Sequence, residues 1–136
     1  MKMKHLLVAG ASLGLLTLTA CQKEEQKTTA EKLQGKWQLE SVFEHIYYDV
    51  DDEERDTAYG TAADYLDFRA DGKMYSFVGG DHDTTNYALQ NDSKILIWDV
   101  SADIHTLTNN TFKIYFKEID PAYPDEYYEQ TINMKR

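Results

Sequence analysis

The feature of this chain that most restricts its fold is a series of short segments in which apolar and polar residues alternate. Residues 36–41 and 65–69 both show this alternation. Successive side chains of a strand point to opposite faces, so each segment predicts a half-buried strand. The sequences at 70–72, 90–93 and 109–110 contain the glycine, aspartate and asparagine that tight turns use. Strands spaced by about 10 residues, with such turns between them, predict an all-β up-and-down antiparallel barrel or a sandwich.

Further segments with strand character complete this pattern, at 73–78, 84–90, 94–100, 111–116 and 127–134. Before them, Thr28-Thr29-Ala30-Glu31 has the spacing of a capping box. It predicts a helical turn over 30–33 that is ended by Gly35. No long amphipathic stretch supports an α/β fold.

The first 21 residues have the composition of an export signal. A basic start, Met1–His5, precedes the apolar run Leu6–Ala20, which is shorter than the ~20 residues that span a bilayer as a helix. Cys21, the only cysteine, follows Leu-Thr-Ala and resembles the acylated cysteine of a bacterial lipobox. The resemblance implies cleavage before Cys21 and an anchor of acyl chains such as palmitate. The alternative is an ordinary signal-peptidase site that leaves a free thiol.

The expected organisation is a signal peptide at 1–20, an acylated cysteine with a polar tether at 21–30, and one domain at 31–136. The tether begins with Gln22-Lys23-Glu24-Glu25, which resembles the acidic signal that sends lipoproteins of bacteroidete-type bacteria to the outer face of the outer membrane. We therefore expect a cell-surface lipoprotein, or otherwise a periplasm-facing one. Removal of residues 1–20 from the 136-residue chain leaves 116 residues, enough for one small domain.

The chain is strongly acidic, which restricts its partners. Its net charge of −10 becomes −12 when Lys2 and Lys4 leave with the signal peptide. Such a surface repels nucleic acid and anionic lipid headgroups, so we expect neutral or cationic partners and no nucleic acid.

A family resemblance covers residues 31–134. It is carried by the order of five segments: Leu33–Leu39, Tyr65–Lys73, Tyr87–Leu89, Ile95–Ile97 and Ile104–Thr108. Together they resemble the small lipocalin-like domain of bacteroidete-type lipoproteins, and Gly35-Lys36-Trp37 resembles the G-x-W opening of lipocalins. The resemblance implies an eight-stranded meander barrel with a ligand-sized interior. It does not identify the ligand, because most members of this family have none assigned. Two departures are the acidic stretch 49–56 and the lack of an arginine assignable over Trp37, since Arg136 is the terminal residue.

Gly35 and Trp37 are expected to close one end of this barrel, where converging strands need a large plug. An eight-stranded barrel is just wide enough to be filled by its own side chains or to hold one small ligand. If a cavity exists, the residues expected to line it are Tyr75, Phe77, Tyr87, Trp98 and Phe116. The alternative is that these aromatics form an ordinary packed core.

Two acidic segments invite a calcium interpretation, and both lack the EF-hand pattern. Glu54 and Asn86 stand where that loop needs glycine. We expect the run 49–56 to be a solvated loop at the barrel mouth, and 81–83 to be part of a hairpin turn. The segment 120–128 reads as a proline-stiffened loop or a contact surface, with Tyr47-Tyr48 expected at the same end.

Nothing in the sequence indicates catalysis. His45, His82 and His105 lack metal-ligand spacing, and no nucleophile elbow or phosphate-binding loop is present. We therefore expect a binding protein with no cofactor and no metal, not an enzyme. The first hypothesis is capture of a small apolar or aromatic ligand in the barrel. The second is a protein-interaction or assembly module of the cell envelope with a filled barrel, whose segments 47–60 and 120–128 meet a basic partner. Inhibition of secreted enzymes ranks third.

Overall fold

The computed structural model describes residues 26–136, which form one short helix and nine strands. The anchor expected at Cys21 and the start of its tether lie outside these residues. The elements are α1 (Thr29–Leu33), β1 (Gly35–Asp49), β2 (Asp52–Tyr59), β3 (Tyr65–Phe68), β4 (Lys73–Val78), β5 (Asp81–Asn91), β6 (Lys94–Ile97), β7 (Val100–Leu107), β8 (Thr111–Ile119) and β9 (Tyr127–Lys135).

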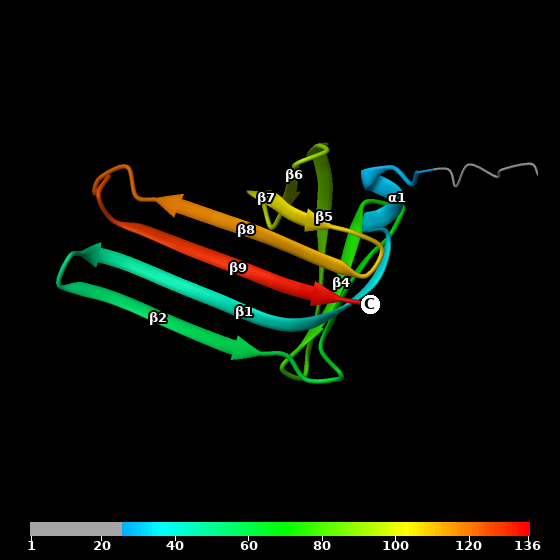
Figure 1. Ribbon diagram of the computed structural model, residues 1–136, viewed down its shortest axis with the longest axis horizontal. Helices are drawn as coiled ribbons and strands as arrows, with labels where there is room; N and C mark the ends of the chain where they lie inside the picture. The colour runs from blue at the N-terminus through cyan, green and yellow to red at the C-terminus, as the bar shows by residue number, and fades with distance from the viewer. Residues whose placement is uncertain (1–25) are drawn as a thin grey trace, which may run out of the picture.

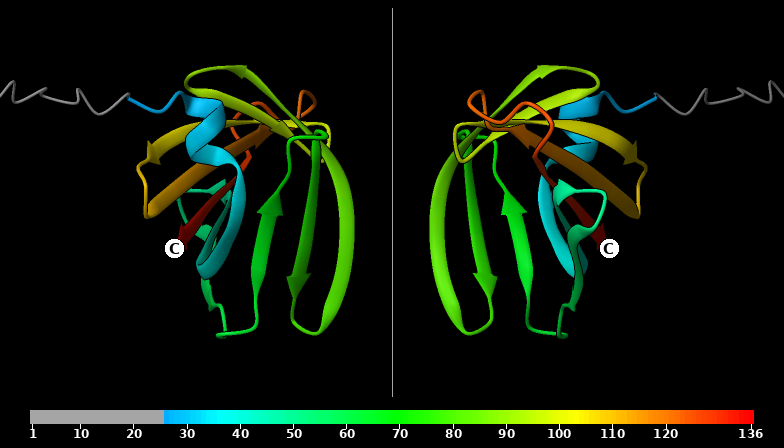
Figure 2. Two further views of the ribbon diagram at one scale, coloured as in Figure 1. Left: turned by 90° about the vertical axis from the view of Figure 1, so that its right-hand side faces the viewer. Right: turned by 90° about the vertical axis from the view of Figure 1, so that its left-hand side faces the viewer.

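The strands confirm the predicted fold class. They pair antiparallel in the order β2-β1-β3-β4-β5-β6-β7-β8-β9, and β1 also pairs with β9. This second pairing closes an up-and-down barrel of eight strands, which are β1 and the consecutive strands from β3 through β9 (Figures 1 and 2). The predicted capping box is present at the start of α1, where Thr28 and Glu31 bond each other's backbone N–H groups.

One strand, β1, belongs to two substructures. Its residues 35–38 pair with β3 inside the barrel, while residues 41–49 pair with β2 along the same edge. The outer half of β1 therefore forms, with β2, β8 and β9, a four-stranded sheet that extends beyond the barrel (Figure 1). Between β2 and β3 the chain turns at Gly60, where a Cβ would lie 2.2 Å from the carbonyl oxygen of Leu39. Only glycine fits this corner.

Three local expectations were wrong. The acidic residues Asp52–Asp56 lie in β2 rather than in a loop, and every residue of that strand is exposed. The segment 94–100 is not one strand, because a turn at Trp98 and Asp99 divides it into β6 and the start of β7. The segment 81–83 is the start of β5, and the turn before it consists of Gly79 and Gly80.

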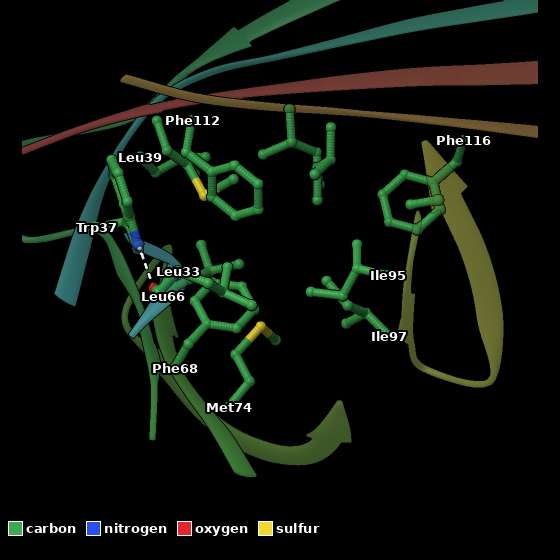
Figure 3. Close-up of a cluster of buried hydrophobic side chains, with 14 residues drawn as sticks. Leu33, Trp37, Leu39, Leu66, Phe68, Met74, Ile95, Ile97, Phe112 and Phe116 are labelled. Carbon is green, nitrogen blue, oxygen red and sulfur yellow. Dashed lines mark hydrogen bonds between the residues drawn. The ribbon is translucent and has the colours of Figure 1, made fainter. Parts of the chain in front are cut away.

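The core fills the barrel from its closed end (Figure 3). Trp37 is completely buried there, and its Nε1 donates a hydrogen bond of 2.8 Å to the carbonyl oxygen of Leu33 in α1. The Arg136 guanidinium lies 3.8 Å above the Trp37 ring and donates to the carbonyl oxygens of Leu33 and Gln34. Gly35 has φ +106°, and a Cβ there would come within 3.3 Å of Arg136 Nη2. This end of the barrel is thus covered by Trp37, α1 and the C-terminal arginine. Within residues 26–136, no helix has the length and apolar character that a membrane crossing requires.

Candidate functional site

A pocket of about 240 Å³ opens at the end of the barrel away from Trp37. Strands β1, β3, β4 and β9 supply most of its wall, and the β6–β7 turn supplies Trp98. The lining residues are Leu39, Val42, Leu66, Ser76, Val78, Trp98, Gln130 and Ile132. Six of the eight are hydrophobic, so the chemistry of the pocket suits an apolar guest with one or two polar contacts.

Strand register places these side chains in the interior. Leu66 pairs with Ser76, two positions along from the buried pair of Phe68 and Met74. Because alternate residues share a face, Val78 follows Ser76 on the inside of β4. The same alternation, together with a bulge after Leu39, aligns β1 with β9 on the other side of the pocket.

Trp98 reaches the pocket from a strained turn. It and Asp99 have φ +52° and φ +60° and join the paired residues Ile97 and Val100 in a two-residue hairpin. Such turns favour Asn-Gly, since few residues tolerate positive φ. Trp98 is 41% exposed, and its ring centroid lies 6.3 Å from that of Phe116. A positive φ is uncommon for a large aromatic residue, and here it places the Trp98 ring at the edge of the pocket.

The expectation that Tyr75 and Phe77 face the barrel interior is not met. Met74 and Ser76 occupy the interior face of β4, so the two aromatics lie on the outside. There the Arg69 guanidinium covers the Tyr75 ring at 4.2 Å, and Phe77 packs against Tyr65 and His82. Neither residue can line the pocket.

Tyr87 and Phe116 do face the interior, but as part of the packed core. Tyr87 meets the Phe68 ring edge-on at 5.1 Å, and its hydroxyl donates to the carbonyl oxygen of Arg69 at 2.7 Å. Phe116 is 5% exposed and lies beneath Trp98. Of the five predicted wall residues, only Trp98 lines the pocket. The register between β3 and β4 would have identified Leu66, Ser76 and Val78 as lining residues, because it shows which alternating positions face the interior.

Next to the pocket, Glu44 of β1 and Tyr128 and Gln130 of β9 form a hydrogen-bonded cluster on the same face of the sheet. The Glu44 carboxylate accepts from the Tyr128 hydroxyl at 2.9 Å and from Gln130 Nε2 at 2.8 Å. Burial, with the hydrogen bond to Glu44, raises the pKa of Tyr128 to about 12. Gln130 Nε2 also donates to the Tyr128 hydroxyl oxygen at 3.0 Å, so these hydrogen bonds hold Gln130 in place at the pocket wall.

The opposite face of the extended sheet carries a second polar cluster. His45 is 7% exposed and lies between Glu53, at 3.0 Å from Nε2, and Glu129, at 3.5 Å from Nδ1. Glu129 also accepts from the Tyr115 hydroxyl at 2.7 Å and from Lys117 at 3.1 Å. Burial alone would raise the pKa of Glu129, but the hydrogen bonds from Tyr115 and Lys117 outweigh it and lower the pKa. Every side chain here has a partner, which is typical of a structural network.

The tips of two hairpins, β1–β2 and β8–β9, border a groove of about 460 Å³. It brings together residues of the two acidic, tyrosine-containing segments 47–60 and 120–128. The lining residues are Ile46, Tyr47, Tyr48, Glu118, Ile119, Asp120, Pro121, Glu126, Tyr127 and Tyr128. None of them is basic.

Among residues 26–136, no cluster of three or more histidine, cysteine, aspartate or glutamate side chains is arranged to hold a metal ion. Comparison with known proteins gives no relative: no family model matches the chain, and no curated protein matches it. The fold therefore defines the class of protein, a lipocalin-like barrel with one closed end and an apolar pocket at the other.

Proposed function

We propose that this protein is a membrane-anchored lipocalin-like lipoprotein that binds a small apolar or aromatic ligand in the barrel. The observation that carries the proposal is the pocket beside Trp98, because its wall is hydrophobic and its entrance holds an aromatic ring in a strained backbone. The Arg136–Trp37 stack supports the family resemblance, since lipocalins place an arginine over the tryptophan of the G-x-W sequence.

The pocket volume limits the ligand. About 240 Å³ is below the roughly 300–1,000 Å³ of sites for drug-sized ligands. The guest is therefore a compound with a few rings or a short chain, or the end of a longer apolar molecule whose remainder lies along the open mouth. Ser76 and Gln130 are the polar groups available to orient it.

The anchor and the location rest on the sequence. Cys21 is proposed to carry acyl chains, and two or more such chains hold a protein on a membrane where one does not. The acidic residues that follow are proposed to direct it to the cell surface.

The test combines native mass spectrometry with one pocket variant. The protein purified from its own host is expected to carry a discrete extra mass that is lost on denaturation. Val78→Trp narrows the entrance without disturbing the core, because Val78 is 42% exposed. We expect it to lower the affinity for an apolar fluorophore such as N-phenyl-1-naphthylamine roughly tenfold, the cost of losing about 1.4 kcal/mol of binding energy.

Phe77→Ala is the matched control, because Phe77 is next to Val78 in β4 but its side chain lies on the outer face of the barrel. It should leave fluorophore affinity unchanged. Absence of extra mass together with equal fluorophore binding by Val78→Trp and the parent protein would reject ligand binding in the barrel and favour the filled-barrel interaction module.

A further inference from the structure

We infer that the groove between the β1–β2 and β8–β9 tips docks a basic, partly apolar segment of a partner protein, with a lysine or arginine side chain inserted between its tyrosines and carboxylates. This inference is independent of ligand binding in the barrel.

The groove has two kinds of wall. Tyr48, Ile119 and Pro121 provide apolar and aromatic surface, and Glu118, Asp120 and Glu126 provide carboxylates. An aromatic face attracts a cation through its quadrupole, and a nearby carboxylate adds a charged partner. This combination recognises an ammonium or guanidinium group better than a neutral or anionic one.

The charge of the surrounding surface favours the same guest. Residues 47–60 and 117–128 contain ten carboxylates and two cationic side chains. Both cations are already paired, Arg55 with Glu53 at 3.1 Å and Lys117 with Glu129 at 3.1 Å. The tips therefore present a strongly negative potential that steers a basic partner toward the groove.

The protein already makes the proposed contact once within itself. Lys117 Nζ lies 3.9 Å from the centroid of the Tyr127 ring while it donates to Glu129. Tyr127 in turn stacks on Tyr47 at 4.9 Å. An ammonium on a tyrosine beside a glutamate is thus an arrangement that this end of the sheet accommodates.

Exposed hydrophobic residues gather at the same tips. Of the seven large hydrophobic residues exposed within the described chain, four lie on the two tips: Tyr48, Val50, Ile119 and Tyr123. Tyrosine and clustered apolar surface are enriched in protein contact sites, whereas such groups are usually scattered on a free surface. The partner segment must therefore carry apolar residues as well as positive charge.

A polypeptide fits these observations better than the other occupants. A second copy of this chain would bring one acidic tip against another, and an anionic membrane would be repelled in the same way. A free small cation would leave the exposed tyrosines and aliphatic side chains uncovered. An extended basic segment covers both the charge and the apolar surface.

The experiment measures binding of a fluorescein-labelled peptide in which lysines alternate with serines and leucines stand at both ends. Fluorescence anisotropy with the protein purified from its own host is expected to show binding that weakens as salt rises. A peptide with glutamates in place of the lysines should not bind. The triple variant Glu118→Gln, Asp120→Asn, Glu126→Gln should weaken binding roughly tenfold or more.

Matched variants separate the groove from the general acidity of the protein. The control is a second triple variant, Asp81→Asn, Asp83→Asn, Asp92→Asn, at exposed positions in β5 and the turn after it. It removes as many negative charges as the groove variant does. Its affinity for the lysine peptide should change less than about twofold, because distant exposed charges are screened. Tyr48→Ala should weaken binding severalfold, whereas Tyr59→Ala, on an exposed tyrosine outside the groove, should not.

Equal losses in the two triple variants would overturn the inference, because binding would then follow net charge alone. No binding of the lysine peptide, or spermidine binding tightly where the peptide does not, would also overturn it. Circular dichroism of each variant verifies the fold, and the amide substitutions keep the Asp120 oxygen that accepts from Ala122 N–H.

Discussion

At the scale of single residues, the C-terminal Arg136 closes the barrel although it lies at the chain end. Its guanidinium stacks on Trp37 and donates to carbonyl oxygens at the end of α1. Those carbonyls belong to the last turn of a helix and have no partner inside it. The Arg136 side chain therefore links the end of β9 to both β1 and α1.

We predict that Arg136→Ala lowers the free energy of unfolding by about 1–2 kcal/mol, because it removes a cation–π contact and hydrogen bonds from a charged donor. Chemical denaturation measures this loss. Lys135→Ala is the control, since its exposed ion pair with Glu40 contributes about 0–1 kcal/mol. An Arg136→Ala protein as stable as the Lys135→Ala protein would show that the stack does not stabilise the barrel.

Single residues also show where sequence reasoning succeeds. Trp37 was predicted to be buried because it alternates with polar neighbours, and it is. In β4 both faces carry hydrophobic residues, so the alternation does not reveal which face is interior. The aromatics Tyr75 and Phe77 were assigned to the interior, but Arg69, Tyr65 and His82 cover them on the outside. Only pairing with β3 determines this choice.

At the scale of elements, Asp64 fixes the corner where the chain leaves β2 and enters β3. It is 5% exposed, and its two oxygens accept from Thr61 N–H at 2.6 Å and Gly79 N–H at 2.9 Å. These hydrogen bonds join the corner to the β4–β5 turn and lower the pKa of the Asp64 carboxyl.

The lowered pKa predicts a pH-dependent contribution to stability. A carboxyl with a depressed folded-state pKa stabilises the fold fully above its ordinary value of 3.8, and the effect disappears as pH falls through the folded value. Asp64→Asn should therefore lower the melting temperature by a constant amount at neutral and weakly acidic pH. Below about pH 4 the difference should shrink. Thermal unfolding over this pH range measures the difference in melting temperature between the parent protein and Asp64→Asn, with Asp81→Asn as a surface control. A melting-temperature difference that does not change with pH would reject the role of the ionised Asp64 carboxylate.

The elements that the sequence failed to predict have a common cause. Strand β2 is acidic and exposed on both faces, so it lacks the alternation by which strands are recognised. It pairs because it follows the long β1 at a hairpin. The β6–β7 turn was missed because Trp98 and Asp99 lack the usual turn glycine. The 70–72 and 109–110 turns, which contain such residues, were predicted at the observed places.

At the scale of the whole molecule, the tip groove lies away from the tether. Residues 26–28 lead into α1 at one end of the long axis, while the hairpin tips lie at the other end (Figure 1). Figure 2 shows α1 in front of the barrel in one end view and behind it in the other. An anchor before residue 26 would join the domain at the end opposite the tip groove, and anionic headgroups would repel the acidic tips.

The position of the tip groove relative to the membrane depends on Cys21 being the lipid anchor. Substitution of Cys21 tests whether it is. Cys21→Ser should abolish incorporation of labelled palmitate, because it removes the thiol on which acylation depends. Glu24→Gln, Glu25→Gln should keep the label and the membrane association but reduce protease accessibility on intact cells. Because the first variant removes the anchor and the second only the proposed surface signal, the two results separate the site of lipidation from the side of the membrane. Labelled, membrane-bound Cys21→Ser protein would place the anchor elsewhere.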